Sequence, residues 1–293
     1  MSAWWSKLRD RARRLQRDEG RHIPDPLWDE TVRRYPFLAQ DTVEDQARLR
    51  SLTGRFLTQK EFHGAAGLEV TDEIAAAIAA QACLPLVHVD AGRGNAALNR
   101  SSALSWYDDF VGVVVQPNEV IARREVVDDS GVVHRYDEVI SGEAMEAGPV
   151  MVSWAAVAES GLTAAEGYNV VIHEFMHKVD MADGVADGCP PLAAGFMGTR
   201  SAAEARKVWL QAWEAAYQAF REKVIIAERF GGNPTWLDPY GAERIEEFFA
   251  VACEGYFVNR TKFAQDFADL VPLLEAFFGT SLPTGTGQER SSP

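Results

Sequence analysis

Two histidines and a glutamate stand at a spacing that suits metal chemistry, because the chain reads His-Glu-Phe-Met-His at 173–177. Residues four apart share one face of a helix, so His173 and His177 can bind the same Zn²⁺. Glu174 then lies beside the metal, where its carboxylate can take a proton from an activated water and pass it to a leaving amine. This pattern predicts peptide hydrolysis. The alternative is a pair of histidines whose hydrogen bonds are satisfied in a core or at a surface.

The residues around the motif predict the helix that carries it. Val170, Val171 and Phe175 recur at helical spacing and are expected to face the core. Asp183 and Gly184 are typical of a helix end. We therefore expect a motif helix of about three to four turns.

A catalytic zinc takes three protein ligands and leaves one position to water, so a further ligand is needed. The other histidines all precede the motif, and none has a partner at ligand spacing: His22, His63, His88 and His134. Downstream, a helix predicted to begin near Gly241 places Glu243, Glu247 and Glu254 on one face. We choose Glu247, because it is central in that face and an apolar run follows it. A carboxylate buried among such residues is costly without a metal or charged partner.

Tyr240 precedes Glu247 by seven residues, about two turns if both lie on one helix. Its phenol could then donate a hydrogen bond to the oxyanion that forms during hydrolysis. Spacing alone equally allows a tyrosine that packs at the start of the helix.

Two further roles remain open at this stage. Asp180 lies three residues after His177, where it could orient a ligand, although a capping or surface role fits as well. The segment 151–154 is a candidate edge strand that pairs with extended substrate, or else an ordinary edge strand.

Composition limits the class of protein. At 47% hydrophobic residues the chain can bury a large core, and it lacks a run of about 18 apolar residues. The net charge of −14 disfavours binding to a phosphate backbone. The N-terminus lacks the apolar region of a secretory signal, and the three cysteines (Cys83, Cys189 and Cys253) match neither a disulfide framework nor a metal site. We expect a soluble cytoplasmic protein with reduced thiols in its core and no integral membrane segment.

Three regions follow from the patterning. Residues 1–21 hold seven Lys or Arg against three acidic residues and are expected to form a basic arm. The arm either touches a membrane surface or an acidic partner, or is a solvated arm that rests on the acidic body of the protein. Residues 22–278 are expected to form a single domain: helices up to about residue 80, short strands within 84–154, and mostly helices from 167 onward. Residues 279–293 are polar and of low complexity, so we expect a disordered tail.

The predicted strands are short apolar or β-branched runs between turn residues: 84–89, 110–116, 124–127, 132–136 and 150–154. The fold class is therefore α/β (α+β). We expect a zincin-type metallopeptidase, in which a small mixed sheet packs on the motif helix and the remainder is mainly helical.

Five blocks in the right order resemble the Mlc titration factor A family of bacterial zinc peptidases. They read GLEVTD at 67–72, QACLP at 81–85, GPVMVSW at 148–154, GYNVVIHEFMHKVDMADG at 167–184 and EFFAV at 247–251. The likeness runs from about Pro36 to Phe278. The likeness does not extend to the basic arm or to the tail. The sequence of residues 243–246 also differs from the one that is usual in the family.

The resemblance implies one Zn²⁺ held by His173, His177 and Glu247, with Glu174 as general base and Tyr240 on the oxyanion side. It also implies a fold related to the catalytic domain of anthrax lethal factor. Known members are cytoplasmic, have aminopeptidase-type activity on small peptides and, in enteric bacteria, bind the glucose repressor Mlc. The competing hypothesis is a regulatory protein that sequesters a transcription factor, with hydrolysis incidental.

Overall fold

A computed structural model describes residues 21–89, 103–118, 120–127, 133–140, 142–144 and 148–280, with backbone only between 120 and 144. The predicted basic arm and tail lie almost entirely outside these residues. Across the described part of the chain, no helix combines the length and the apolar character needed to span a bilayer.

The sheet beside the motif helix has four strands in the order β1 (Glu61–Gly64), β2 (Gly112–Gln116), β6 (Val150–Ser153) and β5 (Gly142–Ala144). β1, β2 and β6 are parallel, and β5 pairs antiparallel with β6. Because β6 has a neighbour on both sides, our prediction that 151–154 forms a sheet edge is wrong. The strand on the outer side is β5.

The motif helix α6 (Val170–Asp180) packs against this sheet and is almost wholly buried. Asn169 caps its start, since the Asn169 side chain accepts a hydrogen bond from the N–H of Ile172 at 2.9 Å. A short 3₁₀ turn follows the helix, and Gly184 then adopts a left-handed conformation with φ 90°. The predicted helix and its stop are both confirmed.

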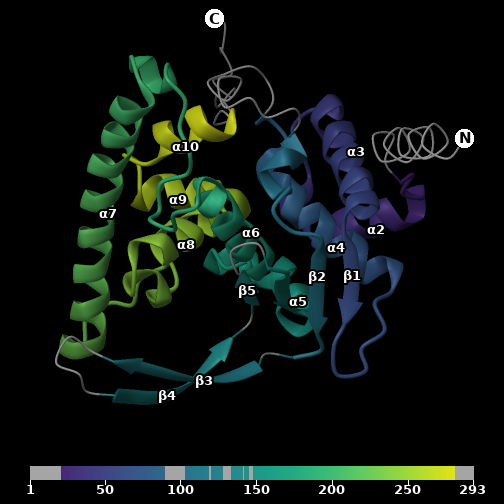
Figure 1. The fold of residues 1–293 in the computed structure, drawn as a ribbon, viewed down its shortest axis with the longest axis horizontal. Helices are drawn as coiled ribbons and strands as arrows, with labels where there is room; N and C mark the ends of the chain where they lie inside the picture. The colour runs from purple at the N-terminus through teal and green to yellow at the C-terminus, as the bar shows by residue number, and fades with distance from the viewer. Residues whose placement is uncertain are drawn as a thin grey trace, which may run out of the picture.

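Helices form most of the remaining described structure and lie on two sides of α6 (Figure 1). One group is α2 (Asp25–Arg34), α3 (Val43–Gln59) and α4 (Asp72–Cys83). The other is α7 (Ala202–Phe230), α8 (Ile245–Val258), α9 (Arg260–Asp266) and α10 (Val271–Phe278), while α5 (Trp154–Thr163) follows β6. The predicted fold class, a small mixed sheet on the motif helix with a mainly helical remainder, is confirmed.

Aromatic packing fixes the motif helix in this arrangement. Phe175 is fully buried, and its ring centroid lies 4.8 Å from that of Tyr107, 5.6 Å from Phe56 and 5.8 Å from Phe110. Edge-on contacts of this kind stabilise beyond the buried area alone. The opposite face of α6 is thereby turned toward α8.

Helix α8 is held from its far side by α7. Trp213 of α7 lies 5.6 Å from the ring of Phe249 and 5.7 Å from that of Phe248. With α8 packed between α6 and α7, residues on its inner face are directed at the motif.

Three local predictions differ from the structure. Residues 84–89 are not a strand, because α4 leads directly into a 3₁₀ turn at Leu84–Leu86 that contains Pro85. In a short apolar run, the hydrophobic periodicity cannot tell a strand from a buried helix or turn. The predicted runs 124–127 and 132–136 belong to longer strands, β3 (Val120–Val127) and β4 (Val133–Ile140), which form a separate antiparallel pair (Figure 1).

The third difference concerns the start of α8. The helix begins at Ile245, and the residues before it, Pro239–Ala242, form a 3₁₀ turn. Glu243 therefore lies outside the helix on which we had placed it.

Candidate metal centre

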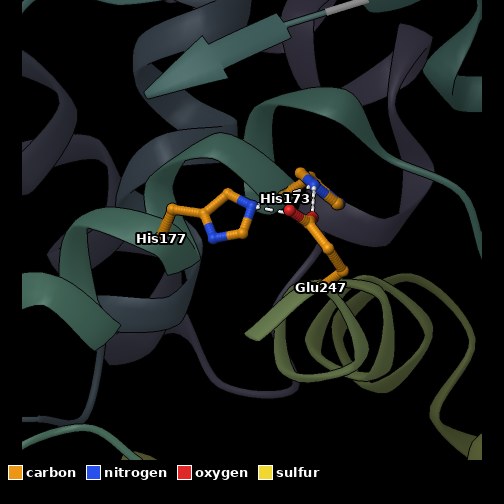
Figure 2. Close-up of side chains that lie close together, drawn as sticks. All are labelled: His173, His177 and Glu247. Atoms are coloured by element: carbon orange, nitrogen blue, oxygen red, sulfur yellow. Dashed lines mark hydrogen bonds and ion pairs between the residues drawn. The ribbon is translucent and has the colours of Figure 1, made fainter. Parts of the chain in front are cut away.

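The structure brings together His173, His177 and Glu247, the predicted metal ligands (Figure 2). Both histidines come from α6 and the glutamate from the first turn of α8. Glu247 Oε2 lies 3.2 Å from His173 Nε2 and 3.1 Å from His177 Nε2, and the two Nε2 atoms are 3.1 Å apart. One atom from each residue thus converges on a common point.

The chemistry of these atoms fits a cation. Nδ1 of His173 lies 2.7 Å from Glu254 Oε1, so the neutral ring, which is the form that binds a metal, carries its proton on Nδ1 and presents a lone pair at Nε2. Glu247 Oε2 is also an acceptor, and two acceptors at this distance need a proton or a metal between them. Glu247 is 4% exposed and His173 is 9% exposed, so water has little access to these atoms and can satisfy them only in part when no proton or metal lies between them.

Opposing effects act on the protonation of these groups. Burial lowers the pKa of His173, but hydrogen bonds to Glu247 and Glu254 outweigh it and hold that pKa well above the ordinary value. Burial dominates at His177 and lowers its pKa. Burial alone would raise the pKa of Glu247, yet the two imidazoles hold it well below its usual range. The glutamate is therefore anionic, as a metal ligand must be.

Glu254 is a functional contact to which sequence reasoning assigned no role. Its second oxygen accepts a hydrogen bond from the backbone N–H of Asn169, the cap of α6, so it joins the start of the motif helix to His173. Carboxylates in this position fix the tautomer and orientation of a ligand histidine. The signal was present in the sequence, because Glu254 lies seven residues after Glu247 on the same helical face, within an apolar run.

Asp180 does not contact a ligand histidine through its described hydrogen bond. Its Oδ2 accepts the N–H of Gly188 at 2.9 Å, in the loop after the motif helix. The carboxylate that holds His173 is Glu254, so the orienting contact we had considered for Asp180 is made by another residue.

Glu174 and Tyr240 lie close to the candidate ligands. Glu174 is 4% exposed on α6, and its charge contributes to the raised pKa of His173. The ring centroid of Tyr240 is 6.0 Å from that of His173. Tyr240 reaches this position from the 3₁₀ turn and not from two turns along α8, so the predicted route is wrong although the proximity is as expected.

Arg244 adds a contact on the opposite side of the glutamate. Its Nη2 donates to Glu247 Oε1 at 3.0 Å, while Oε2 faces the histidines. Its Nε lies 3.2 Å from Oε1 of Glu246. The carboxylate of Glu247 is thereby held by both of its oxygens.

The cysteines take no part in this cluster. Cys83, Cys189 and Cys253 are free and buried. Burial raises the pKa of Cys189 to about 12, and raises that of the other two as well. Neutral, buried thiols agree with the core role expected from sequence.

Comparison with protein families agrees with this centre. The model of a family described as "Glucose-regulated metallo-peptidase M90" matches residues 6–279, nearly the whole chain. The chain belongs to this family. The match takes in most of the basic arm, which the resemblance did not cover, and stops at the tail. Membership implies a metal, for which the His-His-Glu cluster is the candidate site.

Individual relatives align with most of the chain. The Mlc titration factor A of Salmonella arizonae is 32% identical over 247 residues, which span 84% of this chain and 87% of the relative. That of Escherichia fergusonii is 30% identical, spanning 87% of this chain and 86% of the relative. An uncharacterized protein of Synechocystis is 28% identical, spanning 84% and 80%.

Proposed function

We propose that this protein is a zinc-dependent peptidase of aminopeptidase type. The observation that carries the proposal is the convergence of His173, His177 and Glu247. Zinc bonds of about 2.0–2.1 Å in a tetrahedral site would separate the ligand atoms by about 3.3–3.4 Å. The three separations of 3.1–3.2 Å come close to this value. One Zn²⁺ held by these residues would keep a position open for water, as catalytic sites do.

The zinc ion would supply a Lewis acid that acidifies water and polarises the scissile carbonyl. The carboxylate of Glu174 takes the proton of the attacking water and passes it to the departing amine nitrogen. The phenol of Tyr240 donates a hydrogen bond to the oxyanion as the carbonyl becomes tetrahedral. Glu254 keeps the proton of His173 on Nδ1 throughout.

The test combines metal analysis with peptide turnover. Glu174→Gln should retain zinc and lose turnover, because only the base is removed. Glu247→Ala should lose both. Glu222→Ala, an exposed glutamate on α7, serves as the control and should keep both. Turnover retained by Glu174→Gln would reject the mechanism.

A second candidate function is favoured by the relatives that are named Mlc titration factor A. In this case the protein acts in the cytoplasm by binding a transcriptional repressor of the Mlc type and regulates sugar uptake. Hydrolysis is then incidental to binding. Repressor binding measured with Glu174→Gln separates the two, since sequestration should survive the loss of the base.

A further inference from the structure

Arg244 connects the candidate metal centre with the surface of the molecule. Its guanidinium contacts Glu247, whose side chain is 5% exposed, whereas the Arg244 side chain is 63% exposed. A buried ligand and a solvent-accessible cation are therefore neighbours.

The two described contacts leave donors of Arg244 for other acceptors. A guanidinium carries five N–H groups in a rigid plane. Nη2 donates one N–H to Glu247, and Nε forms an ion pair with Glu246, so the described contacts do not engage Nη1 or the second N–H of Nη2. Paired donors of this geometry match the two oxygens of a carboxylate.

We propose that Arg244 determines substrate specificity by binding a carboxylate of the peptide. The carboxylate is either the free C-terminus of a short peptide, in which it lies close to the scissile bond, or an acidic side chain close to that bond. The inference rests on the proposed peptidase function and names its substrate class.

The net negative charge of the protein makes a local contact necessary for any preference for an anionic peptide. With a net charge of −14, the protein as a whole repels an anionic peptide, so any preference for one has to come from a local contact. Glu247 would share its negative charge with the bound metal, so it neutralises Arg244 less than a free carboxylate would.

The experiment compares matched peptides that differ only in a carboxylate. One pair carries a C-terminal carboxylate or its amide, and the other carries Asp or Asn in an amidated peptide. The ratio of kcat/KM within each pair is measured for the zinc-loaded wild type, Arg244→Gln, Arg244→Lys and the control Arg33→Gln. Arg33 is exposed and paired with Glu30 on α2, far along the chain from the centre.

We expect the wild type and Arg33→Gln to prefer the carboxylate in one pair, and that pair identifies its source. Arg244→Gln should reduce the preference about ten- to a hundredfold, mainly through KM, because a charge-assisted hydrogen bond is lost. Arg244→Lys should keep part of it. A wild type that turns over both members of each pair equally overturns the proposal. So does an Arg244→Gln variant that slows both members equally, since Arg244 would then act only by positioning Glu247.

A binding measurement separates this inference from the peptidase proposal. The same peptides are titrated calorimetrically into Glu174→Gln and into Glu174→Gln with Arg244→Gln. Tighter binding of the carboxylate peptide that depends on Arg244 supports the inference even if the wild type hydrolyses nothing. Equal binding of both members refutes it even if hydrolysis is observed.

Discussion

Asp180→Asn should remove a pH-dependent loss of stability. The Asp180 side chain is fully buried, and burial raises the pKa of its carboxyl to about 7, although the N–H of Gly188 partly opposes the shift. In the unfolded chain the pKa is about 3.9. Between these values the folded protein binds a proton that the unfolded chain has lost, so the free energy of unfolding falls as pH rises from about 4 to about 7.

The size of the effect follows from the shift. Each pKa unit corresponds to about 1.4 kcal/mol, so a shift of about three units amounts to at most about 4 kcal/mol at pH 8. Asparagine cannot ionise, yet its Oδ1 can still accept the N–H of Gly188. The stability of Asp180→Asn relative to wild type should therefore rise between pH 4 and pH 8 by a large part of this amount.

The assay is urea unfolding at a series of pH values, with a chelator present so that metal binding does not contribute. Asp29→Asn, at an exposed position of α2, is the matched control for loss of a carboxylate. A stability difference between Asp180→Asn and wild type that stays constant from pH 4 to pH 8 would refute the reasoning.

Three other changes test the positioning of the centre. Glu254→Gln should weaken zinc binding about 10- to 100-fold in a chelator competition, because His173 loses its anionic acceptor. A zinc affinity equal to that of the wild type would show that Glu254 does not orient His173. Phe175→Ala should lower the free energy of unfolding by about 3–5 kcal/mol in urea, and a loss below 1 kcal/mol would contradict its place in the aromatic core. Gly188→Ala should destabilise more than Gly184→Ala. Both glycines have positive φ, but a Cβ at 188 would lie 2.8 Å from the carbonyl oxygen of Ile245 and a Cβ at 184 has open space, so equal losses would show that the contact is unimportant.

The motif helix could be predicted because the information is local. The spacing of His173 and His177, the apolar positions and the stop at Gly184 all lie within a few turns of one another. The choice of Glu247 rested on a different argument, the cost of a carboxylate in an apolar run. The structure places that residue against both histidines, about seventy residues away in the chain.

Elements that lack a local signal could not be predicted. β5 is three residues long, and nothing in Gly142–Ala144 indicates a strand, so β6 was taken for an edge. β1 has largely exposed side chains and no apolar alternation. The start of α8 was placed too early, because Asp238 accepts the N–H of Tyr240 and stabilises a separate turn before the helix.

A loop that contains no candidate ligand lies against both ligand helices and α7. Gly188 donates its N–H to Asp180 of α6, and its carbonyl accepts the indole N–H of Trp209 of α7 at 2.8 Å. A Cβ at Gly188 would lie 2.8 Å from the carbonyl oxygen of Ile245, where α8 begins, so the loop passes close to the start of that helix. Because Glu247 follows Ile245 by two residues, we expect a displacement of this loop to change the distance between the carboxylate and the histidines. Asp180 therefore contacts this loop, and its described hydrogen bond does not reach a ligand histidine, because the spacing of three residues from His177 fixes a position on the helix but not the partner that the side chain meets.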